Sequence, residues 1–109
     1  MPATTADPSQ PSREQVDALP GETLLEFGAD WCGHCMAAQS AIGAALSSHP
    51  QTRHMKIEDG RGRPLGRSFR VKLWPTLILL RDGSEAARVV RPTSAEQVMA
   101  LWNAADGAP

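Results

Sequence analysis

The segment Trp31-Cys32-Gly33-His34-Cys35 is the most informative part of this chain. It holds the only two cysteines, which follow an apolar run and stand at the start of a helix-like pattern. Two thiols at this spacing can close a small disulfide ring with little movement of the backbone. A helix start offers unpaired N–H groups and a positive dipole end, which favour a thiolate at Cys32. The segment therefore predicts a dithiol that exchanges electrons with other disulfides.

Length and composition restrict the remaining possibilities. A chain of 109 residues predicts one domain with a modest core, and a net charge of −1 argues against a nucleic-acid-binding protein. No apolar run approaches the roughly 18 residues of a membrane span. Residues 1–15 lack the basic and apolar regions of a signal peptide, so we expect a cytoplasmic protein. There, a lone cysteine pair is more often catalytic or metal-binding than structural.

The domain is expected to span residues 12–105. It would follow a disordered, proline-containing tail over 1–11 and precede a short tail over 106–109. The patterns predict helices over 12–19, 33–47, 64–70 and 93–105, and strands over 23–28, 53–57, 76–80 and 86–90. This order predicts an α/β fold, with a central mixed sheet covered by helices on both faces.

Four features are similar to the thioredoxin family over residues 13–105. They are the run Leu24–Asp30 before the Trp-Cys-x-x-Cys centre, the centre itself, Trp74-Pro75-Thr76, and the turn Asp82-Gly83. The Gly33-His34 pair resembles the protein disulfide isomerase subgroup. The resemblance implies a thioredoxin fold, here with a four-stranded sheet, because no convincing first strand precedes Ser12.

The resemblance also implies roles for the central residues. Cys32, expected to be the more exposed thiol, would attack the substrate, and the more buried Cys35 would resolve the mixed disulfide. Glu26 would be a buried carboxylate that accepts the proton of Cys35, and Lys56 would lie near it. The alternatives are a surface glutamate on an edge strand and a solvated lysine.

Two further groups support the centre. The Gly33-His34 pair, through a cation or dipole between the cysteines, would make the disulfide more oxidising, unless His34 is simply exposed. The resemblance implies a cis Pro75 in a substrate-binding loop with Trp74 and Thr76. Trp74 would either form an apolar rim with Trp31 or belong to the core.

The chain departs from the family pattern at three places. Gly28 replaces an aromatic residue, Met36 replaces a lysine, and Arg91-Pro92 stands where the family has a glycine used in substrate docking.

A zinc site is the remote alternative, because Cys32, Cys35, His49 and His54 match the spacing of a Cys2His2 finger. The pattern opposes it, since Pro50 separates the two histidines and the cysteines stand at a helix start.

A binding or chaperone-partner module is another alternative. Arg63, Arg67 and Arg70 recur at helical spacing and predict a basic face, which is either simply solvated or steers acidic partners.

The favoured interpretation is a thiol–disulfide oxidoreductase that reduces protein disulfides, with an isomerase or oxidase of an oxidising compartment as the alternative. The electrons reside on sulfur, so we expect no cofactor and no metal. The expected partners are protein disulfides and a thiol electron donor, such as a reductase. We expect a monomer that binds neither nucleic acid nor a membrane.

Overall fold

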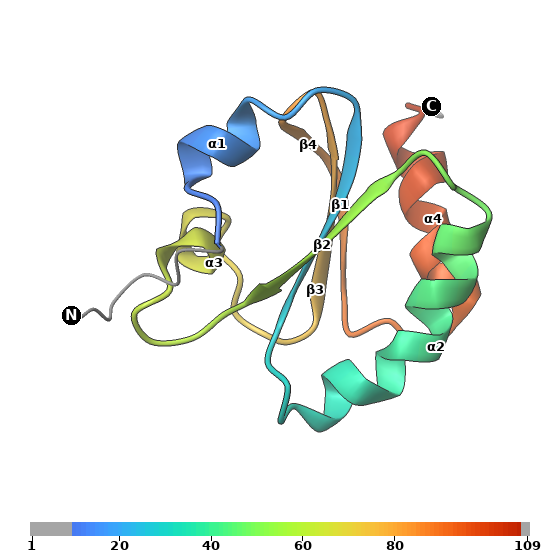
Figure 1. The fold of residues 1–109 in the computed structure, drawn as a ribbon. Helices are drawn as coiled ribbons and strands as arrows, with labels where there is room; N and C mark the ends of the chain where they lie inside the picture. The colour runs from blue at the N-terminus through green and yellow to red at the C-terminus, as the bar shows by residue number, and fades with distance from the viewer. Residues whose placement is uncertain (1–9, 108–109) are drawn as a thin grey trace.

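The computed structural model describes residues 10–107. Its elements are α1 (Arg13–Asp17), β1 (Glu22–Gly28), α2 (Gly33–Ser47), β2 (Arg53–Glu58), α3 (Pro64–Ser68), β3 (Thr76–Arg81), β4 (Ser84–Val90) and α4 (Ala95–Ala105). Figure 1 shows the sheet at the centre, with α1 and α3 on one side and α2 and α4 on the other. Every predicted element is present, with bounds that shift by a few residues.

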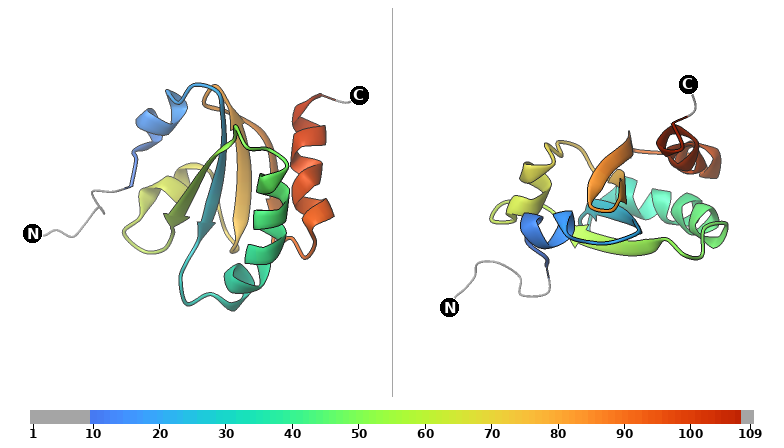
Figure 2. Two further views of the ribbon diagram at one scale, coloured as in Figure 1. Left: turned by 45° about the vertical axis from the view of Figure 1, so that its right-hand side comes forward. Right: turned by 90° about the horizontal axis from the view of Figure 1, so that it is seen from above.

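The four strands form one mixed sheet in the order β2-β1-β3-β4. β1 pairs parallel with β2 and antiparallel with β3, and β3 pairs antiparallel with β4. The view from above in Figure 2 separates the two helical layers from the sheet between them. This is the thioredoxin fold in a four-stranded form, as expected.

The sheet buries both faces, which is why β1 and β3 consist of apolar runs rather than alternating patterns. On the α2 and α4 face the buried core comprises Leu24, Ala38, Ile42, Ala45, Leu77, Leu79, Val98, Leu101 and Trp102. On the α1 and α3 face it comprises Val16, Leu25, Phe27, Ile57, Leu65, Phe69, Ile78 and Leu80. Because β1 is central and buried, a polar side chain within it must find partners.

The β3–β4 hairpin closes through the predicted Asp82-Gly83 turn. Both residues have positive φ, 51° and 82°, as a two-residue type I′ turn requires. A side chain on Gly83 would collide with the backbone of Asp17, so this position also needs glycine for space.

The structure corrects the prediction of a basic face on one helix. The predicted helix over 64–70 ends at Ser68, and Arg70 takes a left-handed conformation with φ of 60°. Arg63, Arg67 and Arg70 are therefore not one helical face, although all three line the same hollow.

The predicted tails fall mainly on residues 1–9 and 108–109, which lie outside the described residues. Within the described part, Gln10 Nε2 donates to the backbone oxygen of Glu58 at 2.6 Å. At the other end, Asp106 pairs with Arg81 at 2.8 Å. Contacts with the domain therefore extend slightly beyond both ends of 12–105, and the exact domain boundaries remain a prediction.

Candidate active site

The two cysteines lie at the end of β1 that leads into α2. Cys32 caps the N-terminus of α2, and its Sγ accepts a hydrogen bond from the backbone N–H of Cys35 at 3.1 Å. A sulfur that accepts backbone hydrogen bonds at a helix start is held in the environment that favours a thiolate. The two thiols are free in this structure and are placed for reversible disulfide formation.

The two thiols differ in solvent exposure far less than expected. Cys32 is 7% exposed and Cys35 is 6% exposed, so both are buried to the same degree. Solvent exposure therefore does not distinguish the two thiols as nucleophiles. The charges and hydrogen bonds around each sulfur must account for any difference in reactivity.

The pKa values of the two thiols move in opposite directions. Burial opposes ionisation of Cys32. The Cys35 thiol, the backbone N–H groups of Cys35 and His34, and the Arg91 guanidinium together outweigh it, so the pKa of Cys32 is lowered. Burial, the neighbouring Cys32 thiol and the charge of Glu26 together raise the pKa of Cys35 to about 11. Cys32 therefore ionises first.

Glu26 is buried on the central strand β1, with 4% exposure. Its Oε1 accepts from His54 Nε2 at 2.7 Å, and its Oε2 accepts from Gln39 Nε2 at 2.7 Å. Burial opposes ionisation, but these hydrogen bonds and the charge of Lys56 outweigh it, so the pKa of Glu26 is lowered. The expectation of a buried, ionisable carboxylate is met, and the surface alternative is not.

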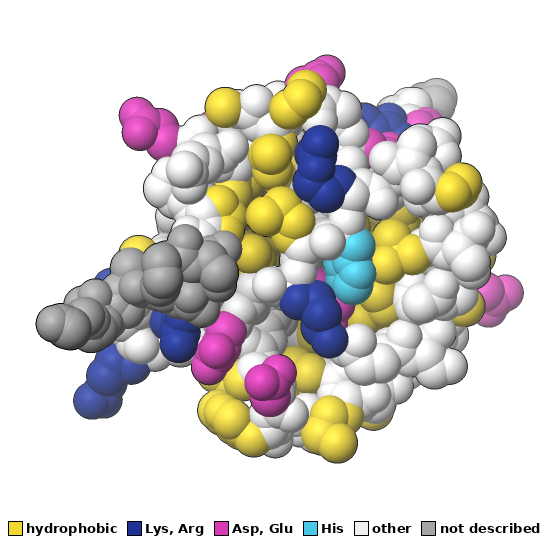
Figure 3. Space-filling model, in the orientation of Figure 1, with side chains coloured by type: hydrophobic (Ala, Val, Ile, Leu, Met, Phe, Trp, Pro, Cys, Tyr) yellow, Lys and Arg dark blue, Asp and Glu magenta, His cyan; other side chains and the backbone are white. Residues whose placement is uncertain are grey.

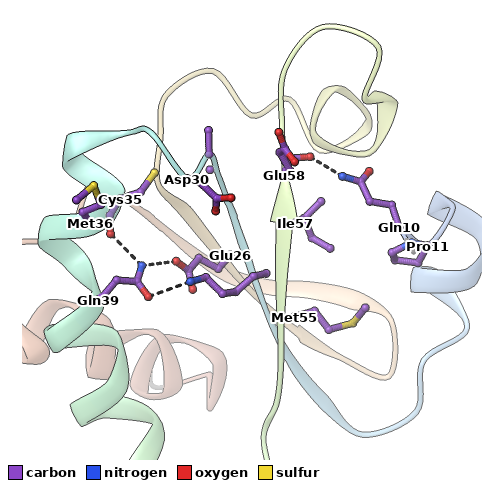
Figure 4. Close-up of a pocket in the computed structure, with 13 residues that line it drawn as sticks. Gln10, Pro11, Glu26, Asp30, Cys35, Met36, Gln39, Met55, Ile57 and Glu58 are labelled. Atoms are coloured by element: carbon purple, nitrogen blue, oxygen red, sulfur yellow. Dashed lines mark hydrogen bonds between the residues drawn. The ribbon is translucent and has the colours of Figure 1, made fainter. Parts of the chain in front are cut away.

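Lys56 makes no direct hydrogen bond or ion pair with Glu26, although the two residues are register partners in the β1–β2 pair. Its Nζ donates to Gln39 Oε1 at 3.2 Å, so its link to the carboxylate runs through Gln39. Gln39 Nε2 also donates to the backbone oxygen of Cys35 at 2.9 Å, so Gln39 connects the carboxylate of Glu26 to Cys35 (Figure 4).

Gln39 and His54 were missed as site residues by the sequence interpretation. Gln39 stands four residues after Cys35, which places both on one face of α2. His54 precedes Lys56 by two residues, so both project from the same face of β2. The space-filling view shows a histidine side chain among Lys and Arg side chains over this edge of the sheet (Figure 3).

An aromatic rim lies beside the cysteines. The rings of Trp31 and Trp74 meet edge to face with centroids 5.4 Å apart, and Trp31 is 76% exposed. Trp74 is half-buried, and its Nε1 donates to Asp59 Oδ2 at 2.9 Å. The rim alternative for Trp74 is therefore correct, and the core alternative is not.

The Trp74–Pro75 peptide bond is cis, in agreement with the prediction. Pro75 and Thr76 are buried at the start of β3, and Thr76 Oγ1 donates to the backbone oxygen of Leu73 at 2.6 Å.

Comparison with known proteins decides the family. The family model described as Thioredoxin matches residues 8–104. A thioredoxin of Chlamydia pneumoniae is 34% identical over 81 residues, which cover 72% of this chain and 79% of that protein. The chain belongs to the thioredoxin family.

A solved structure supports the same assignment over nearly the whole chain. Thioredoxin 2 from Pseudomonas aeruginosa PAO1, in its reduced form, is 51% identical, covers 97% of this chain and 98% of its own, and has a TM-score of 0.81. A thioredoxin of Chlamydia muridarum is 37% identical over 71 residues, which cover 64% of this chain and 69% of that protein. The protein is therefore a thiol–disulfide oxidoreductase of the thioredoxin family.

Gly28 lies at the end of β1, directly beside Cys35. A Cβ atom on Gly28 would lie 2.5 Å from Cys35 Sγ, so the sulfur occupies space that any side chain would need. A cavity of about 480 Å3 adjoins this position and reaches from Cys35 past Glu26 to Lys56 and Glu58 (Figure 4).

Arg91 provides a cation that the family glycine at this position could not. It has a positive φ of 53°, its backbone N–H donates to Pro75 O at 2.8 Å, and its Nε donates to Trp74 O at 2.8 Å. Arg91 thus connects the end of β4 to the cis-proline loop while its charge lowers the pKa of Cys32.

The structure does not bring the four residues of the zinc-finger alternative together as metal ligands. His49 stacks on Trp102 with centroids 3.9 Å apart, while His54 is bonded to Glu26. Within residues 10–107 there is no group of three or more His, Cys, Asp or Glu side chains that could hold a metal ion. In the same range, no helix is both long and apolar enough to cross a membrane.

Proposed function

We propose that this protein reduces disulfide bonds in other proteins, with Cys32 as the nucleophile and Cys35 as the resolving thiol. The observation that carries the proposal is the opposite shift of the two pKa values at nearly equal burial. The thiolate is the reactive form of cysteine, so the thiol that ionises first attacks first.

The proposed reaction moves two electrons from the two cysteine sulfurs to the two sulfurs of the substrate disulfide. The Cys32 thiolate attacks one sulfur of the substrate disulfide, which forms a mixed disulfide and releases the first substrate thiol. Cys35 then gives up its proton and attacks Cys32 Sγ, which releases the second substrate thiol and leaves the Cys32–Cys35 disulfide. Two electrons from a thiol donor, such as a thioredoxin reductase, restore the dithiol.

Glu26 is proposed as the acceptor of the Cys35 proton. Its carboxylate is ionised because His54 and Gln39 stabilise the charge, and that charge raises the pKa of Cys35, which supports the proposal. Trp31, Trp74, Pro75 and Thr76 are proposed as the surface that receives the substrate chain, with Gly33 and His34 shaping the helix start.

The reductive direction is favoured over isomerase or oxidase chemistry. The relatives described above are thioredoxins, which supports the reductive direction. We place the protein in the cytoplasm, where thiols are kept reduced.

Insulin reduction in the presence of dithiothreitol tests the proposal. Cys32→Ser is expected to abolish turnover while the fold remains intact by circular dichroism. In a separate reaction without dithiothreitol, pre-reduced Cys35→Ser should still attack and accumulate a mixed disulfide, which intact mass would reveal. Substantial turnover by Cys32→Ser would refute the assigned nucleophile.

A further inference from the structure

Positive charge is concentrated in one segment of this chain. Residues 61–72 contain five of the eleven Lys and Arg residues and none of the twelve Asp and Glu residues. The whole chain has a net charge of −1, so the remainder is acidic. The basic segment surrounds α3 and leads directly into the cis-proline loop, and Lys and Arg side chains project beside the β2–α3 connection at the lower left of Figure 3.

Four of these cations line a hollow of about 420 Å3, which is here called the basic hollow. Its lining residues are Asp59, Gly60, Arg63, Arg67, Arg70, Val71 and Lys72. The left-handed turn at Arg70 lets this side chain face the hollow together with Arg67 of α3. Arg67, Arg70 and Lys72 are exposed, and within residues 10–107 none of their side chains makes a hydrogen bond or an ion pair.

The basic hollow adjoins the active site through Asp59. This residue lines the hollow, and its Oδ2 accepts the hydrogen bond from Trp74 Nε1 at 2.9 Å. Trp74 in turn touches Trp31, the neighbour of Cys32. Along the chain, Lys72 and Trp74 are two residues apart, so their Cα atoms are separated by at most about 7 Å.

Two apolar side chains near the cis-proline loop are exposed. Leu73 is 50% exposed and lies between Lys72 and Trp74, and Val90 at the end of β4 is 43% exposed. A substrate chain lying on the tryptophan rim would therefore pass from an apolar surface to a basic one within a few residues.

We propose that the basic hollow binds acidic residues of the protein substrate that lie a few positions from the attacked cysteine. This rests on the proposed reductase function and specifies its substrate class as disulfides flanked by Asp or Glu. Arginine guanidinium groups that lack protein partners bind carboxylates through charge-assisted hydrogen bonds. Because the groups are exposed, the effect should appear mainly in the rate of association and should weaken with salt.

Two disulfide-bonded peptides test the proposal. They differ only in residues flanking one cysteine, which are glutamates in the first and glutamines in the second. The second-order rate constant of reduction by the fully reduced protein is measured at low and at high salt. At low salt we expect the Glu peptide to react roughly three- to tenfold faster, and at high salt the difference should shrink.

The double variant Arg67→Gln/Arg70→Gln should lose this preference. The matched control Gln51→Glu/Ala100→Glu changes the net charge by the same amount at exposed positions outside the hollow, and it should keep the preference. Equal rates for the two peptides, or equal losses in the double variant and the control, would overturn the proposal. Equal rates together with variant-sensitive binding of single-stranded DNA would assign the hollow to nucleic acid instead.

The Gln peptide separates this proposal from the proposed function. A protein that reduces neither peptide contradicts reductase activity. The hollow is then tested by fluorescence anisotropy with a Glu peptide whose cysteines are replaced by serine. Tighter binding to the parent than to Arg67→Gln/Arg70→Gln supports the hollow, and equal binding refutes it.

Discussion

His54 Nε2 lies 2.7 Å from Glu26 Oε1, so a histidine on β2 bonds to the buried carboxylate of β1. Gln39 Nε2 lies equally close to the other oxygen of that carboxylate. Glu26 is therefore held as an anion by two side chains, one from each element that packs beside it. The ionisation of Glu26 therefore depends on His54 and Gln39, which lie outside the Cys-x-x-Cys segment.

His54→Ala is expected to raise the pKa of Glu26 and to destabilise the fold by about 1–2 kcal/mol at neutral pH. The pKa of Glu26 is lowered on folding, so its ionisation stabilises the fold above the unfolded pKa. That contribution disappears as pH falls through the folded pKa, so the variant and the parent should converge in acid. Urea unfolding across pH measures this.

Lys56→Met is the control for His54→Ala, because Lys56 donates no hydrogen bond to the carboxylate and its charge is the smallest of the causes that lower the pKa of Glu26. It should change stability less and leave the pH dependence near that of the parent. Parallel stability curves for His54→Ala and the parent at every pH would contradict the assigned role of His54.

Gly28→Ala is expected to slow the resolving step. The new Cβ would lie 2.5 Å from Cys35 Sγ, so the sulfur or the strand must shift, at a cost of about 1–3 kcal/mol. Quenched-flow alkylation with intact mass should show the Cys32 mixed disulfide persisting longer than in the parent.

Gly43→Ala is the matched control for Gly28→Ala. Gly43 lies inside α2 with open space around its Cα, so alanine should stabilise the helix by about 0.5–1 kcal/mol and leave resolution unchanged. A Gly28→Ala protein that resolves at the rate of the parent would show that the sulfur has room to move.

The two thiols are expected to titrate in separate steps. Cys32 should ionise below the ordinary thiol pKa, and Cys35 should ionise near about 11. Ultraviolet thiolate absorbance of the reduced protein measures both steps, and Cys35→Ser isolates the first. Two overlapping steps at an ordinary thiol pKa would contradict the pKa difference on which the assignment of Cys32 as the nucleophile rests.

Arg91→Met is expected to raise the pKa of Cys32 and to slow its alkylation at neutral pH by roughly two- to threefold, because an exposed charge is screened. Arg91→Lys keeps the charge and should restore most of the rate. A Lys variant as slow as the Met variant would mean that Arg91 acts through its bond to Trp74 O rather than through charge.

The sequence was sufficient to predict the elements of the sheet, because their signals are local. The apolar run of β3 and the Asp82-Gly83 turn both determine structure within a few residues. The end of α3 was predicted too late, because the left-handed conformation of Arg70 has no signal in its residue type.

The partners of Glu26 were harder to predict. A lysine near the buried acid was expected, but the direct partners are His54 and Gln39. Which side chain reaches a buried carboxylate depends on the register of β1 with β2 and on how α2 packs across the sheet. The similar burial of Cys32 and Cys35 also depends on this packing rather than on order along the chain.

The reduction potential of the Cys32–Cys35 pair tests the central claim most directly. The protein is equilibrated in glutathione buffers, alkylated and analysed by intact mass. A reductase predicts a potential at or below the cytosolic glutathione poise of about −220 to −260 mV. A value near or above about −180 mV, as in disulfide isomerases, would contradict the reductive direction and assign the Gly33-His34 centre to oxidase or isomerase chemistry.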